Sequence, residues 1–130
     1  MRDPAGLFRA LADDTRLQML ALIRQHGELC GCDLEHVLEI GQSKVSRHLR
    51  YLLNAGLLKD RRVAVWIHYR IAEDLDEAQA ELLSVVDKLL SAEKMREMNA
   101  KLAAWQQQKK SGVADDTSSR RVVLQSSLKP

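Results

Sequence analysis

Two cysteines, Cys30 and Cys32, are the residues whose type and spacing most directly suggest chemistry in this sequence. Thiolates bind soft metal ions and react with oxidants. A structural disulfide usually joins distant segments, and a bridge across a single residue would be strained. The pair therefore predicts thiolates in one of three roles: a metal site, a redox sensor, or small buried residues with no reactive role.

The bulk composition predicts a single domain of ordinary size with a packed core. The chain has 130 residues, of which 45% are hydrophobic and 29% are charged. No apolar run approaches the roughly 20 residues that a membrane span needs. The first residues also lack the apolar core of a signal peptide. We therefore expect a cytoplasmic protein with no membrane partner.

The charged residues are divided unevenly along the chain. Residues 42–70 contain seven Lys or Arg and one acid, whereas residues 71–93 contain seven acids and one Lys. A basic block beside an acidic block indicates one surface that faces a polyanion. Two solvated faces of opposite charge would give the same pattern, so charge alone leaves both interpretations open.

Hydrophobic periodicity and capping residues predict the elements that position these groups. The predicted helices cover residues 4–12, 15–26, 33–39, 42–54 and 75 to at least 90. Residues 28–31 form an extended link, and two strands cover 57–60 and 65–71, joined by residues 61–64. Asp74 and Glu77 are predicted to cap the last helix, and a bend is expected near residues 91–93. The polar residues from Lys109 onward predict a flexible tail, so the domain is placed at 1–108 and the tail at 109–130.

The order of these elements predicts a mainly α fold with a β-hairpin, the winged helix-turn-helix. Helix 15–26 is apolar nearly all round and should be buried. Helix 42–54 carries polar and basic side chains on the face opposite its apolar stripe, and such side chains can meet bases and phosphates. His48 flanks the apolar stripe, which favours a packed, hydrogen-bonded residue. The candidate DNA-binding residues are Gln42, Ser43, Lys44, Ser46, Arg47, Arg50, Arg61 and Arg62.

Three motifs in this order resemble the ArsR/SmtB family of metalloregulators. They are LFRALADDTRL at residues 7–17, QSKVSRHL at 42–49, and AGLL at 55–58 followed by WIHYR at 66–70. The resemblance covers about residues 7–90. It implies a homodimer, joined through its terminal helices, that represses a resistance operon by binding a two-fold symmetric operator on double-stranded DNA. It implies no enzymatic activity.

Within that family, ELCGCDL at residues 28–34 is similar to the signature of arsenic and antimony sensors. This similarity implies that Cys30 and Cys32 bind As(III) or Sb(III) as an inducer, with no permanent cofactor. Many of these sensors have a third cysteine where this chain has Glu35. The wing tip departs too, with Ala64 and Val65 in place of the usual glycine and basic residue. Zinc sensors carry ligands on the last helix, and the absence of histidine from residues 75–105 excludes that site.

The spacing of the two cysteines suggests how an inducer could act. Side chains two apart on a helix point in nearly opposite directions, whereas alternate residues of an extended segment share a face. We therefore expect inducer capture to disfavour helix at this turn and so disturb the packing of helix 42–54. A ligand that prefers the DNA-free form weakens DNA binding by the same factor. With two protein thiols available, a monomethylated arsenic, which needs two sulfurs, is a further candidate inducer.

Three other functions remain as alternatives. A thiol-based redox repressor would use the same cysteine pair to sense oxidants. A small thiol reductase is disfavoured because the strand, motif and helix order of thioredoxin-like folds is missing. In a constitutive regulator of another operon with no inducer, Cys30→Ser and Cys32→Ser would leave induction unchanged in cells challenged with arsenite.

Overall fold

The computed structural model describes residues 3–111, which form six helices and a three-stranded antiparallel sheet. In chain order the elements are α1 (Pro4–Leu11), α2 (Asp14–His26), β1 (Glu28–Cys30), α3 (Gly31–Leu38), α4 (Gln42–Asn54), β2 (Leu58–Val63), β3 (Trp66–Ile71), α5 (Glu77–Leu89) and α6 (Ala92–Ser111). The predicted winged helix-turn-helix is confirmed. Residues 28–30 of the predicted extended link form strand β1, and α3 begins at Gly31 rather than at Asp33. Beyond the expected bend the chain continues as a second helix, α6.

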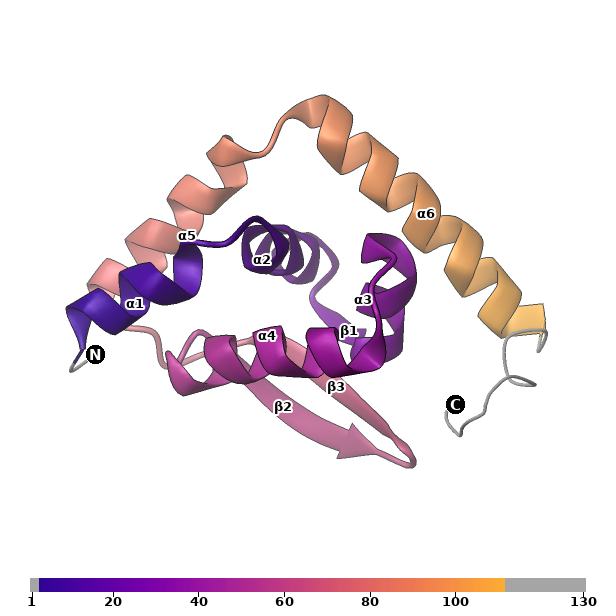
Figure 1. The fold of residues 1–130 in the computed structure, drawn as a ribbon, viewed down its shortest axis with the longest axis horizontal. Helices are drawn as coiled ribbons and strands as arrows, with labels where there is room; N and C mark the ends of the chain where they lie inside the picture. Colours follow the sequence, from indigo (N-terminus) through magenta and orange to yellow (C-terminus); the bar gives the residue numbers. More distant parts are fainter. Residues whose placement is uncertain (1–2, 112–130) are drawn as a thin grey trace.

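Helix α2 lies at the centre of the molecule, as its apolar sequence predicted. Asp13 caps it by accepting a hydrogen bond from the backbone N–H of Arg16, and Gly27 ends it at a positive φ of 87°. Met19, Leu20 and Ile23 are completely buried. Around α2, one side of the molecule is formed by α4 and the β2–β3 hairpin, and α5 and α6 form an arch over the other side (Figure 1).

The sheet has the strand order β1-β3-β2, so the third strand lies in the middle. Strand β1 pairs with β3 through Cys30 opposite His68, and β2 pairs with β3 through Asp60 opposite Tyr69. The hairpin is longer than predicted, because Arg61 and Arg62 belong to β2 and only residues 64–65 form the turn. Ala64 takes the left-handed conformation that this turn requires, with φ 57°.

The C-terminal region differs from the sequence prediction in two details. The cap of α5 is Asp76 with Gln79, rather than Asp74 with Glu77. Both pairs have the same spacing, and the one nearer to the first helical turn makes the hydrogen bonds. The chain leaves α5 at Leu90 and starts α6 at Ala92, close to the expected bend.

The structure continues α6 through Lys109 to Ser111, past the boundary that the sequence placed at residue 108. The rest of the predicted tail, residues 112–130, lies outside the described residues. Among the described helices, none is long and apolar enough to cross a membrane.

Candidate functional site

The cysteine pair lies where β1 ends and α3 begins. Cys30 is the residue before the helix and has an extended backbone, with φ −86° and ψ 165°, and Cys32 lies in the first helical turn. Because one residue is extended and the other helical, their side chains converge over a Cα–Cα distance of 5.4 Å. The sulfurs are joined in a disulfide, so the predicted free thiols are not what the structure contains. Cys30 is buried and Cys32 is partly exposed.

This arrangement bears on the expected switching mechanism. The spacing of the cysteines required a non-helical residue at the pair, and Cys30 is that residue. Ligand capture was also expected to disfavour helix at this turn. In the structure both sulfurs lie within bonding distance while α3 is intact from Gly31 onward, so their convergence alone does not require the helix to unwind.

Asp33, one residue beyond the pair, organises the site and was not singled out from the sequence. Its side chain is 5% exposed. One carboxylate oxygen accepts a hydrogen bond from the backbone N–H of Cys30 at 3.0 Å. The other accepts hydrogen bonds from the indole N–H of Trp105 and the ammonium group of Lys109, both at 2.9 Å. A single buried carboxylate therefore joins the start of α3 to the end of α6.

Helix α6 covers one side of the cysteine pair. The Lys109 Nζ lies 3.7 Å from the Cys30 Sγ and 3.9 Å from the Cys32 Sγ. The Trp105 ring stacks on His36 of α3, with ring centroids 3.4 Å apart. Met98 and Leu102 of α6 are buried with Trp105 in the core. The spacing of these three apolar residues could have predicted an α6 packing face, but not its partner.

The cysteine strand is also connected directly to the wing. Glu28 of β1 accepts two hydrogen bonds from the Arg61 guanidinium on β2, at 2.7 and 2.8 Å. These hydrogen bonds hold the pKa of the Glu28 carboxyl below its usual value. Arg61, a predicted DNA contact, is thus paired within the protein, and its charge is partly neutralised. Arg62 is exposed nearer to the hairpin turn.

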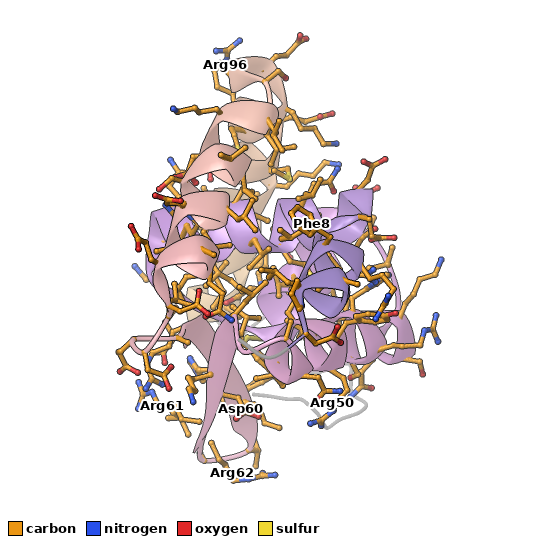
Figure 2. The ribbon with its side chains drawn as sticks, turned by 90° about the vertical axis from the view of Figure 1, so that its left-hand side faces the viewer. Phe8, Arg50, Asp60, Arg61, Arg62 and Arg96 are labelled. Carbon is orange, nitrogen blue, oxygen red and sulfur yellow. A yellow bond between two sulfur atoms is a disulfide. The ribbon has the colours of Figure 1, made fainter. Side chains whose placement is uncertain are left out.

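Helix α4 has the bounds and the faces that the sequence predicted. Its apolar residues Val45, Leu49 and Leu52 are buried. All six candidate DNA-binding residues on it are exposed: Gln42, Ser43, Lys44, Ser46, Arg47 and Arg50. Figure 2 shows that Arg50 of α4 and the hairpin residues Arg61 and Arg62 lie at the same end of the molecule. The structure therefore brings Arg50 of α4 to the same end of the molecule as the two hairpin arginines.

His48 is packed rather than presented to solvent, as the sequence favoured. Its Nδ1 lies 3.0 Å from the Arg16 guanidinium and 3.7 Å from the Asp13 carboxylate. Burial lowers the pKa of His48, with Asp13 opposing that shift and Arg16 adding to it. Arg16 itself is buried and donates hydrogen bonds to the carbonyls of Arg9 and Ala10, which ties α1, α2 and α4 together.

Comparison with known proteins places this chain among transcription regulators. Residues 13–60 match the family model described as bacterial regulatory protein, arsR family. Over 85 residues the chain is 48% identical to the arsenic resistance transcriptional regulator ArsR1 of Pseudomonas putida. That alignment covers 65% of this chain and 66% of ArsR1. Over 80 residues the chain is 44% identical to the arsenical resistance operon repressor of Escherichia coli, and the alignment covers 62% of this chain and 68% of that repressor.

Solved structures give the same result. The AntR antimony-specific transcriptional repressor superposes with a TM-score of 0.52 and 32% identity, over 65% of this chain and 78% of that one. A homodimeric winged helix-turn-helix DNA-binding domain from Mycobacterium bovis superposes with a TM-score of 0.55 and 32% identity. That match covers 67% of this chain and 81% of the other. The predicted family resemblance is confirmed, and the family consists of regulators rather than enzymes. The chain therefore belongs to the arsR family of bacterial regulatory proteins.

Proposed function

We propose that this protein is a homodimeric repressor that binds operator DNA and releases it when As(III) or Sb(III) binds Cys30 and Cys32. The observation that carries the proposal is the convergence of the two sulfurs at the junction of β1 and α3. Two sulfurs that can bond to each other can also reach one metalloid atom. Relatives named as arsenic resistance regulators and an antimony-specific repressor support this choice of inducer.

Inducer binding requires the reduced form of the pair. A dithiol or two monothiols reduce the disulfide by two electrons and become oxidised to a disulfide themselves. Arsenite, as the neutral trihydroxide, then exchanges two hydroxyl groups for the two thiol sulfurs and releases two water molecules. Thiolates are soft ligands, which disfavours Mg²⁺ and Ca²⁺ at this pair.

The site is coupled to both proposed DNA-reading elements by direct contacts. Strand β1 pairs with β3 of the wing, and α3 packs against α4. A ligand at Cys30 and Cys32 therefore binds at the junction of β1, which contacts the wing, and α3, which contacts the recognition helix α4. A coupling of about 1–3 kcal/mol would weaken operator binding by about 5–150-fold.

The DNA-binding surface is proposed to consist of the exposed residues of α4 and the hairpin. Basic side chains there would contact phosphates, and the N-terminal residues of α4 would meet base edges in the major groove. The proposed residues are Gln42, Ser43, Lys44, Ser46, Arg47, Arg50, Arg61 and Arg62. Arg61 would have to exchange Glu28 for a phosphate, so we expect it to contribute less than Arg62.

Dimerisation is proposed to occur through α1 and α5. Phe8 of α1 is 60% exposed, and Val85 and Leu89 of α5 are 45% and 61% exposed. In Figure 2, Phe8 lies on the side of the molecule that faces the viewer, where α1 and α5 both lie. Large apolar side chains exposed on one face are typical of a contact with another chain. The relative from Mycobacterium bovis is a homodimer.

The proposal is tested by release of labelled operator DNA from the reduced protein. Arsenite, antimonite, monomethylated arsenic, cadmium and zinc are titrated against the wild type, Cys30→Ser and Cys32→Ser. We expect arsenite or antimonite to release the wild type at low concentration and both variants to stay bound. Release by zinc alone, or equal release of the serine variants, would refute the proposal. If arsenite acts at far lower concentration than the methylated form, the hypothesis that monomethylated arsenic is an inducer fails.

The disulfide favours a second candidate function, a redox-sensing repressor that uses the same pair. In that case hydrogen peroxide would oxidise the dithiol to the disulfide, two water molecules would form, and DNA would be released. The same assay separates the two functions. Release by peroxide without release by arsenite supports the redox repressor, and the opposite result supports the metalloid repressor.

A further inference from the structure

The ammonium group of Lys109, on α6, is hydrogen-bonded to the Asp33 carboxylate, which lies beside the cysteine pair. Its Nζ donates to the Asp33 Oδ1 at 2.9 Å and lies within 4 Å of both sulfurs. The lysine side chain is 30% exposed, whereas the carboxylate is almost fully buried at 5%. The contact is therefore a partly desolvated ion pair at the mouth of the site, rather than a solvated surface pair.

Without Lys109, the neighbouring donor atoms form a three-ligand group. One ligand atom each from Cys30, Cys32 and Asp33 lies within 4.8 Å of the other two. Two sulfurs and a carboxylate oxygen are a donor set that suits Zn²⁺ and similar divalent cations. The Asp33 Oδ1 would retain its hydrogen bond from Trp105 and still have a lone pair for a cation.

We propose that Lys109 determines the specificity of the cysteine pair by withholding Asp33 from divalent cations. The ammonium group occupies the carboxylate oxygen and adds a positive charge close to both sulfurs, which repels a cation. A neutral metalloid hydroxide needs the two thiols alone and meets no such repulsion. This inference rests on the proposed function, because it assumes that the inducer binds the reduced pair.

The packing of α6 fixes Lys109 in this position. Trp105, one helical turn earlier, is anchored by its hydrogen bond to the same carboxylate and by its stacking on His36. The ammonium group also lies 5.7 Å from the centroid of the Trp105 ring and 5.9 Å from that of Trp66, distances at which aromatic faces attract a cation. The neighbouring Lys110 is exposed and makes no such contacts within residues 3–111, which makes it a matched control for the loss of one charge.

The experiment measures direct binding of Cd²⁺ and, separately, of arsenite to the reduced full-length protein without oxygen. Calorimetry gives both affinities for the wild type, Lys109→Met, Lys109→Arg and Lys110→Met. We expect Lys109→Met to raise the Cd²⁺ affinity at least tenfold while the arsenite affinity changes less than threefold. Lys109→Arg, which keeps the charge, and Lys110→Met should both match the wild type. Adding Asp33→Asn to Lys109→Met should remove the gain.

Two further arms keep the result interpretable. Lys109→Gln can still donate a hydrogen bond to Asp33, and tryptophan fluorescence reports whether α6 stays docked. Lys109→Gln should also raise the Cd²⁺ affinity. The proposal would be overturned if the Cd²⁺ affinity rose only in Lys109→Met and tryptophan fluorescence showed that α6 is undocked in that variant. An unchanged Cd²⁺ affinity in Lys109→Met, or an equal rise in Lys110→Met, would overturn it too. Failure of the proposed function appears separately, as a wild type that does not bind arsenite.

Discussion

Replacing Asp33 with alanine tests whether one buried carboxylate holds the cysteine site and α6 together. The change removes hydrogen bonds from the Cys30 N–H, the Trp105 indole and the Lys109 ammonium, with lengths of 2.9–3.0 Å. Hydrogen bonds to a charged group contribute about 1.5–3 kcal/mol each, and the charge left behind, on Lys109, belongs to a side chain that is 30% exposed and can be solvated. These contributions overlap and do not add, so we expect a loss of about 4 kcal/mol.

Such a loss is a large part of the roughly 5–15 kcal/mol that stabilises an ordinary domain. Urea unfolding followed by circular dichroism and by tryptophan fluorescence measures it. Glu39→Gln is the matched control, because it breaks the Lys101–Glu39 pair that also links the end of α3 to α6. Those side chains are 41% and 69% exposed, and exposed pairs contribute about 0–1 kcal/mol. If Asp33→Ala loses no more stability than this control, the assigned role of Asp33 is wrong.

Three further predictions concern DNA, assembly and pH. Arg47→Ala should weaken operator binding and lower the slope of log affinity against log salt by about one, measured by fluorescence anisotropy; an unchanged slope would place Arg47 away from phosphate. Phe8→Glu should shift the protein from dimer to monomer in sedimentation equilibrium, and a variant that stays dimeric would place the interface elsewhere. Because burial holds the pKa of His48 below its usual value, the unfolded chain binds more protons at this position. The free energy of unfolding should therefore fall as pH drops from about 6.5 through the folded pKa, and less steeply in His48→Gln; equal slopes would contradict the assignment.

Much of this protein could be predicted from its sequence because the deciding signals are local. The bounds of α4 follow from its apolar stripe and the glycines near both of its ends, and its polar face needed no knowledge of the rest of the fold. The same local pattern indicated the buried helix α2 and the bend near residues 91–93. The cysteine pair was evident from residue type and spacing. Its assignment to metalloid chemistry came from the resemblance of residues 28–34 to a known signature.

The tertiary structure decided what surrounds the pair. Strand β1 has three residues, too few for a periodic signal, and exists because Glu28 pairs with Arg70 in the hairpin. Lys109 follows Cys30 by 79 residues, and the sequence had placed it in a flexible tail. Its position depends on the packing of Trp105 against α3, which no local pattern encodes. Residue types and helical faces are set by neighbours along the chain, whereas the partners of Asp33 and of the two sulfurs are set by contacts between distant segments.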